Sequence, residues 1–188
     1  MSRVIYKARD QASQEVIRML EALFVAELAS PSRCLWIVSP WISDVPLIDN
    51  STGHYDFFSG SDWKTIDLSE VLAELCSRGS QIVVATTDAP TNRPFLETLE
   101  RRFQERDLID SLIVTVGSAA VEHVKLIVGD RFVISGSMNF TFRGLFVRDE
   151  MIELKTDPQA VADTRLFVHG EFGGSLQGTQ KGQATETR

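Results

Sequence analysis

The sequence predicts an α/β fold in which one mixed β-sheet is flanked by helices on both faces. Short apolar runs, typical of buried strands, alternate along the chain with segments whose apolar residues recur every three or four positions, as in amphipathic helices. The chain has 188 residues, of which 43% are hydrophobic and 24% charged, a composition typical of a globular domain with its own core. We therefore expect a single domain over residues 1–172.

Charge and cysteine content narrow the classes of function. The formal net charge of −7 argues against a protein that coats nucleic acid through its overall charge, although a local basic patch could still bind phosphates. Cys34 and Cys76 lie in apolar stretches, so we expect two core thiols, no disulfide framework and a cytoplasmic location. Neither a signal peptide nor an apolar run of about 18 residues is recognisable, so we expect no membrane span.

The first half of the chain is predicted to contain two helices and two buried strands. Helices are expected at residues 11–29 and 67–78, and strands at 34–39 and 81–86. Gly79 ends the second helix, and Asp67 or Ser69 is expected to cap its start. Residues 43–66 combine Pro, Gly, Ser and Asp with several aromatic side chains, so we expect a long, ordered loop there.

The second half continues the alternation. Helices are expected at 95–107 and 157–168, and strands at 112–116, 121–128, 132–135 and 151–154. Residues 173–188 are polar and rich in glycine, which is typical of a disordered tail.

A β-hairpin is predicted around Gly129, because glycine as the first residue of a two-residue connection favours a type II′ turn. This register would place Lys125 opposite Ile134, and His123 opposite Gly136. Because His123 and Lys125 are two residues apart on the predicted strand, we expect their side chains on one face of it.

The residues at the open end of this hairpin suit a phosphoryl group. The chain leaves the second strand through Ser137 and Asn139, beside His123. Lys125 and Asn139 can donate hydrogen bonds to phosphoryl oxygens, and Gly136 allows a close approach. The imidazole can act as a nucleophile or as an acid and base.

These residues resemble a known signature. The pattern His123-x-Lys125-x4-Asp130-x5-Gly136-Ser137-x-Asn139 is similar to the HxKxxxxD…GSxN motif of the phospholipase D superfamily. The family usually has six residues between the Asp and the Gly, whereas this chain has five. Arg148 stands where the family commonly has an Asn, and Glu150 matches its acidic residue. Segments 35–41 and 75–84 resemble the family's first core strand and its crossover, so the resemblance covers residues 33–155.

The resemblance implies a metal-independent phosphodiesterase that needs no cofactor. Bacterial family members with a single motif dimerise to complete one site. One His123 would then attack phosphorus and form a phosphohistidine, and the second subunit's copy would protonate the leaving oxygen. Lys125, Asn139 and Ser137 would bind the phosphate, and Glu150 would orient the imidazole.

Charges near the motif favour nucleic acid as the substrate. From His123 to Arg148, four basic residues stand against one acidic residue, Asp130, and a dimer would double this patch. Arg143 and Arg148 are candidate phosphate contacts, and Trp41 either lines the cleft or packs in the core. Asp130 lies roughly 20 Å along the strand from His123, so we predict a structural role for it.

Three functions remain open at the level of the sequence. The first is a homodimeric DNA endonuclease, in a bacterial defence or DNA-modification system, because most single-motif bacterial members are nucleases. The second is a catalytically weak or inactive binding module in a larger complex of unidentified partners, which the shortened hairpin and Arg148 would suit. The third is a phospholipase or phosphatidyl transferase, against which the single motif and the expected lack of a membrane anchor argue.

Overall fold

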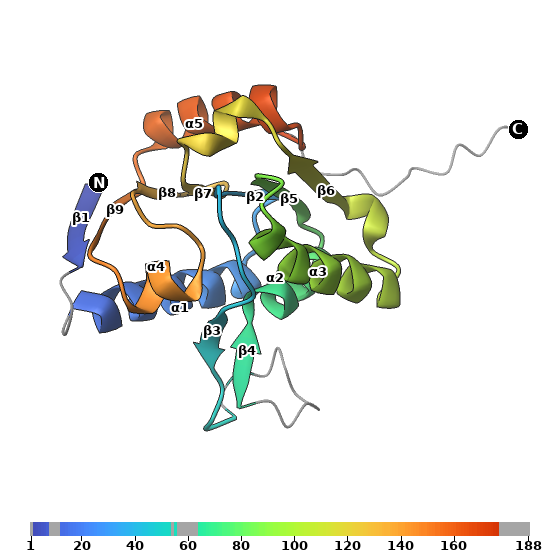
Figure 1. The fold of residues 1–188 in the computed structure, drawn as a ribbon, viewed down its shortest axis with the longest axis horizontal. Coiled ribbons are helices and arrows are strands. Elements are labelled where there is room, and N and C mark those ends of the chain that lie inside the picture. The colour runs from blue at the N-terminus through green and yellow to red at the C-terminus, as the bar shows by residue number, and fades with distance from the viewer. Residues whose placement is uncertain (1, 8–11, 54, 56–63, 177–188) are drawn as a thin grey trace, which may run out of the picture.

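The computed structural model describes residues 2–7, 12–53, 55 and 64–176, and a seven-stranded mixed sheet forms its centre (Figure 1). The strands, in their spatial order, are β1 (Ser2–Lys7), β9 (Glu150–Lys155), β8 (Val133–Gly136), β7 (Leu126–Val128), β2 (Cys34–Val38), β5 (Gln81–Thr86) and β6 (Leu112–Val116). β2, β5 and β6 run parallel, and the other pairings are antiparallel. A separate ribbon pairs β3 (Pro46–Asp49) with β4 (Thr65–Asp67).

Helices cover both faces of the sheet, which confirms the predicted fold class. On one face lie α1 (Ala12–Ala29), α2 (Leu68–Ser77) and α3 (Arg93–Glu105), and on the other lies α5 (Pro158–Phe172) (Figure 1). The short helix α4 (Phe142–Phe146) contacts α1. Within the described ranges, these elements are joined by the 3₁₀ helices η2 (Pro90–Asn92), η3 (Ile109–Ser111) and η4 (Ala119–Glu122).

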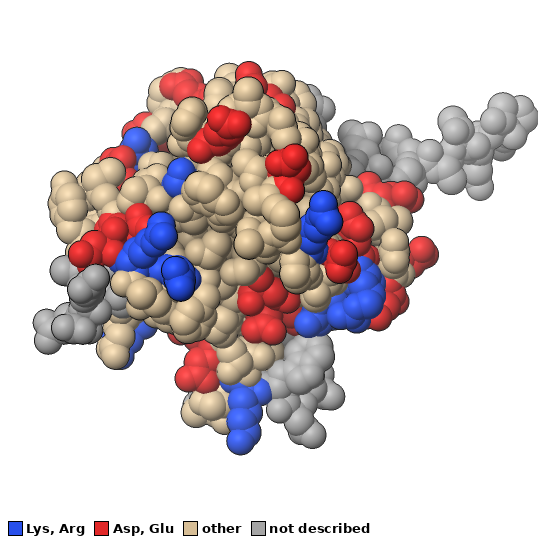
Figure 2. Space-filling view, in the orientation of Figure 1, with Lys and Arg blue, Asp and Glu red and all other residues tan. Residues whose placement is uncertain are grey.

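The face of the molecule drawn in Figure 2 is of mixed charge. Figure 2 shows acidic and basic side chains interspersed over the same side of the molecule, as expected for a modest net charge. Within the part of the chain that the structure describes, no helix is both long and apolar enough to cross a membrane.

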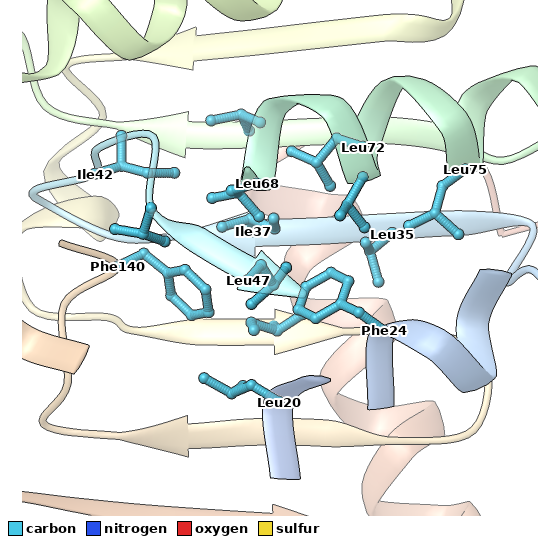
Figure 3. Close-up of a cluster of buried hydrophobic side chains, with 14 of the residues drawn as sticks. Leu20, Phe24, Leu35, Ile37, Ile42, Leu47, Leu68, Leu72, Leu75 and Phe140 are labelled. Atoms are coloured by element: carbon cyan, nitrogen blue, oxygen red, sulfur yellow. The ribbon is translucent and has the colours of Figure 1, made fainter. Parts of the chain in front are cut away.

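β2 forms the centre of the core and is buried along its whole length. Leu35 and Ile37 pack on the side of α1 and α2, in one cluster with Phe24 (Figure 3). Trp36 and Val38 point to the opposite face and join a smaller cluster beneath α5. Burial of both faces explains why this strand is a continuous apolar run rather than an alternating one.

The two cysteines are core residues without a disulfide, as the sequence predicts. Both Cys34 and Cys76 are buried and free. Burial raises the pKa of the Cys34 thiol to about 12 and also raises that of Cys76. Both side chains therefore stay protonated and unreactive near neutral pH.

Most predicted elements are confirmed. The strands expected at 81–86 and 112–116 match β5 and β6, and the helix expected at 11–29 matches α1 from residue 12 onward. The other three predicted helices are found as α2, α3 and α5, with ends shifted by a few residues. From residue 177 onward, the predicted tail lies outside the described residues.

Some short elements differ from the prediction. The expected loop at 43–66 contains β3 and β4, and the prediction missed α4, because strands of three or four residues and a five-residue helix are too short to show a clear period. The prediction also missed β1, in which Ile5 is the one buried residue among those at 2–6, so this strand forms no continuous buried run. Asp67 stands at the N-cap position of α2 but makes no capping bond with its side chain. Instead, the Asp44 carboxylate accepts hydrogen bonds from the Ser69 N–H (2.8 Å) and hydroxyl (2.7 Å).

The first strand of the hairpin is shorter than predicted. A strand was expected over 121–128, but β7 begins at Leu126 and the preceding residues form η4. His123 terminates η4 and does not belong to a strand. The predicted pairing of His123 with Gly136 is therefore wrong.

The hairpin register also differs by two residues from the prediction, because Ile127 pairs with Ile134. Both side chains face the larger core cluster, and a shift of two residues leaves every side chain on the same face of the sheet. The turn lies one residue later than predicted and is closed by the Gly129 N–H, which donates to the Phe132 carbonyl (3.0 Å). A Cβ on Gly129 would lie 2.5 Å from the Phe132 ring and 2.7 Å from Ser32 Oγ. The glycine is thus needed for close packing, and its φ is not positive.

Candidate active site

Four strand ends meet at one edge of the sheet. β2 and β8 end there, and β7 and β9 begin there, because β7 runs antiparallel to β2 and β8 while β9 runs antiparallel to β8. The loops at this edge come from segments that are far apart in the sequence. They carry most of the sequence-predicted site residues: Trp41, His123, Lys125, Gly136, Ser137, Asn139, Arg143, Arg148 and Glu150.

His123 and Lys125 both lie at this edge, but their local backbone structure differs. His123 is exposed at the end of η4, with φ −117° and ψ −9°. Lys125 is half-buried directly before β7, where it lines a small cavity together with Ile127 and Gly136. Strand alternation, which predicted a shared face, therefore does not apply to this pair. Neither side chain forms a hydrogen bond or ion pair with the described residues.

Ser137, directly after β8, is hydrogen-bonded to the first residues of β9. Its N–H donates to the Met151 carbonyl (3.0 Å), and its hydroxyl accepts from the Met151 N–H (3.0 Å). The same hydroxyl donates to the Glu150 carboxylate. A Cβ on Gly136 would lie 2.0 Å from the Met151 carbonyl oxygen, so only glycine allows this close approach. In this structure, the partner of Glu150 is Ser137.

Asn139 is held against the loop that follows β2. The neighbouring Phe140 N–H donates to Ser39 Oγ (3.1 Å), and the Ser43 N–H donates to the Phe140 carbonyl (2.8 Å). The Asn139 side chain is only 8% exposed, and its Oδ1 is buried without a hydrogen-bond partner among the described residues. Such an oxygen indicates a place where a donor from outside the chain could bind.

Trp41 is positioned by a buried asparagine that the sequence analysis missed. Asn92 Oδ1 accepts from the Ile42 N–H (3.0 Å), and its Nδ2 donates to the Pro40 carbonyl (3.0 Å). These two bonds fix the backbone on both sides of Trp41, whose side chain is 49% exposed. The Trp41 side chain therefore lies at the surface, where it lines a cavity, and is not packed in the core.

A cavity of about 420 Å³ opens beside these residues. It is lined by Trp41, Ile42, Ser43, Thr91, Asn139, Thr141, Phe142, Arg143 and Arg148. Basic side chains stand over α4 on this side of the molecule (Figure 2). The sequence analysis did not include Thr91 and Phe142. Phe142 could have been noticed, because it is an aromatic residue three positions after the motif's Asn.

The basic patch is smaller than the sequence suggests. Arg131 lies at the turn of the hairpin, away from the site edge, and pairs with Glu27 (3.2 Å). Asp130, in the same turn, pairs with Arg33 (3.0 Å) and Arg165 (2.9 Å). The two arginines of the cavity remain as basic groups at the site. Within the described ranges, no three His, Cys, Asp or Glu side chains gather as a metal site would require.

No protein-family model and no curated protein sequence matches this chain. Solved structures do match. Nuc from Salmonella typhimurium, a phospholipase D family member, superposes with a TM-score of 0.58 and 12% identity, over 91% of this chain and 93% of its own. NucT from Helicobacter pylori superposes with a TM-score of 0.57 and 10% identity, over 91% of this chain and 94% of its own.

A larger protein shares the same fold. Phosphatidylserine synthase from Haemophilus influenzae superposes with a TM-score of 0.54 and 16% identity, over 90% of this chain and 37% of its own. The chain therefore has the fold of the phospholipase D superfamily.

Proposed function

We propose that the protein is a phosphodiesterase that cleaves DNA without a metal ion, through a phosphohistidine and as a homodimer. The observation that supports this most directly is the gathering of His123, Lys125 and Asn139 at one sheet edge of a phospholipase D-like fold. An imidazole nucleophile beside an ammonium and an amide suits a phosphodiester, because negative charge on the phosphoryl oxygens needs donors.

In the first step, an imidazole nitrogen of His123 attacks phosphorus. The bond from phosphorus to the leaving oxygen breaks, and the protonated His123 of the partner subunit gives its proton to that oxygen. Lys125 and Asn139 donate hydrogen bonds to the phosphoryl oxygens in both steps. The products are one released strand end and a covalent phosphohistidine.

In the second step, water attacks the phosphohistidine. The neutral His123 of the partner subunit takes a proton from this water, the phosphorus–nitrogen bond breaks, and both imidazoles return to their starting states. Ser137, whose hydroxyl Glu150 holds in the structure, is a further donor to the phosphate. Glu150 is also the carboxylate that we propose to orient the nearby imidazole.

The arginines of the cavity support DNA over a phospholipid. Arg143 and Arg148 are exposed and form no ion pair with a carboxylate of the described residues. Their guanidinium groups therefore remain accessible to the successive phosphates of a nucleic-acid backbone.

The test is cleavage of circular DNA, both single-stranded and supercoiled, in excess EDTA. We expect wild-type protein to cleave, and His123→Gln to be slower by about 10³-fold because it lacks both nucleophile and acid. His169→Gln is the matched control, since His169 is also exposed but lies on α5, away from the site edge. It should cleave like the wild type.

A second measurement tests the intermediate. After an acid-free quench with phosphorus-labelled DNA, wild-type protein should carry covalent phosphate that acid removes and alkali does not, and His123→Gln should carry none. DNA binding without cleavage by either protein would contradict the proposal in favour of a non-catalytic module. Hydrolysis of phosphatidylcholine vesicles without cleavage of DNA would contradict the choice of substrate.

A further inference from the structure

The cavity beside the candidate catalytic groups has aromatic walls that the phosphodiester chemistry does not use. Its volume of about 420 Å³ lies within the range of small-ligand sites. Trp41 is 49% exposed and Phe142 is 56% exposed, and both line this cavity. Two large rings that are open to solvent at one concave site indicate a ligand with an apolar, flat surface.

The fold holds the Phe142 ring and the backbone at Trp41 in place before any ligand binds. Phe142 stacks on Phe146, with 4.7 Å between the ring centroids and 29° between the ring planes. The backbone next to Trp41 is fixed by the hydrogen bond from the Ile42 N–H to Asn92 Oδ1. Because these segments are already fixed, little conformational freedom is lost when a ligand stacks on the rings.

The same cavity carries unpaired positive charge. Arg143 and Arg148 line it without a carboxylate partner among the described residues, whereas Arg131 and Arg165 are both ion-paired. An arginine of this kind can contact phosphate or stack on a flat ring. Aromatic faces beside a basic groove are the usual means by which proteins hold unpaired bases.

We propose that this cavity binds an unpaired nucleobase of single-stranded DNA, next to the phosphate that is cleaved. The base contacts both Trp41 and Phe142, and the flanking phosphates contact Arg143 and Arg148. This inference rests on the proposed function and adds a preference for strands with exposed bases. In a duplex, a base is paired and stacked, so it would have to be flipped out before it could enter the cavity.

Binding is measured in the His123→Gln background, which separates affinity from cleavage. Three fluorescent DNA probes of equal length are compared: a single strand, a duplex, and a single strand whose central nucleotides are abasic. We expect the first to bind at least about tenfold more tightly than the other two, since only it offers an accessible base.

Two variants locate the base. Trp41→Leu and Phe142→Leu should each weaken binding of the intact single strand about tenfold, which corresponds to about 1.4 kcal/mol, and leave binding of the abasic strand unchanged. Phe167→Leu is the matched control, because Phe167 is also an exposed phenylalanine but lies on α5. If thermal unfolding shows that Phe142→Leu is not folded, Trp41→Leu decides the test.

The outcomes distinguish the nucleobase site from the proposed phosphodiesterase activity. Equal affinity for the three probes, or base-dependent binding that survives both variants, would overturn the nucleobase site. Base-dependent binding in a wild-type protein that cleaves no DNA would support the nucleobase site and contradict the proposed phosphodiesterase. DNA cleavage that does not depend on the two aromatic residues would support the phosphodiesterase and contradict the nucleobase site.

Discussion

Asn139 shows how one residue can serve a site while weakening the fold. Its Oδ1 is buried without a hydrogen-bond partner among the described residues, and an oxygen in that position costs about 1–3 kcal/mol. Asn92 is the contrasting case, because it is also buried but bonds to the backbone of Pro40, Ile42 and Thr87. The fold therefore uses both ends of the Asn92 amide, whereas it leaves the acceptor oxygen of Asn139 unpartnered among the described residues.

The two asparagines should respond differently to the same substitution. Asn139→Leu removes an unpartnered polar group, so the free energy of unfolding should stay within about 0.5 kcal/mol or rise, while DNA cleavage falls by about 10²-fold or more. Asn92→Leu should lower the melting temperature by roughly 5–10 °C, because it leaves buried backbone groups unpartnered. Thermal unfolding and cleavage assays on both variants check this. A large loss of stability in Asn139→Leu would show that its side chain supports the fold.

At the scale of elements, the two ends of the β7–β8 hairpin differ in their contacts. Its open end carries the candidate site, and its turn carries Asp130, which pairs with Arg33 and Arg165. Arg165 belongs to α5, is only 9% exposed and lies over the Trp36 ring at 5.7 Å. The turn thus ties the hairpin to the helix on the far face of the sheet, in agreement with the structural role expected for Asp130.

Asp130→Asn should therefore act on stability and not on chemistry. A nearly buried guanidinium that loses its carboxylate costs about 3 kcal/mol, which lowers the melting temperature of a domain of this size by roughly 6–12 °C. The protein that remains folded should cleave DNA at the wild-type rate. Glu105→Gln is the control, because the Arg101–Glu105 pair is exposed on both sides and such pairs contribute little. A fall in cleavage without a fall in melting temperature would assign Asp130 to the site.

At the scale of the whole molecule, each chain carries a single copy of the motif. The proposed chemistry needs two imidazoles, one as nucleophile and one as acid. His123 is exposed at the sheet edge, where a second copy can approach it. A symmetric pair of chains places the same residue on both sides of the interface, so one shared site per dimer follows from the proposal.

A heterodimer of wild-type and His123→Gln chains, purified through two different tags, tests that sharing. A shared site lacks one of its two imidazoles in this heterodimer, so cleavage should fall about as far as in the His123→Gln homodimer. Light scattering first checks that each preparation has the mass of a dimer. Half of the wild-type rate in the heterodimer, or full activity in a monomer, would contradict a shared site.

Sequence patterns alone determined the local structure of this protein. Longer apolar runs and periodic segments predicted β2, β5, β6 and the four main helices, because burial of a strand or helix face leaves its period in the sequence. The spacing of the residues from His123 to Asn139 identified the motif without any knowledge of the fold. Short elements such as β3 and α4 span too few residues to show a period, and β1, although six residues long, has one buried residue among those at 2–6. All three depend on contacts with segments distant in the sequence.

Only the tertiary structure decided which side chains meet. The paired Ile127 and Ile134 of the hairpin lie in a core built largely from other elements, and strand alternation alone does not distinguish registers that differ by two residues. The hydrogen bond from Ser137 to Glu150 depends on how β9 pairs with β8. The cavity that joins Trp41 to Phe142 brings together loops about a hundred residues apart. The physical reason is that these contacts join different strands or loops. The residue pattern within any one segment therefore does not predict them.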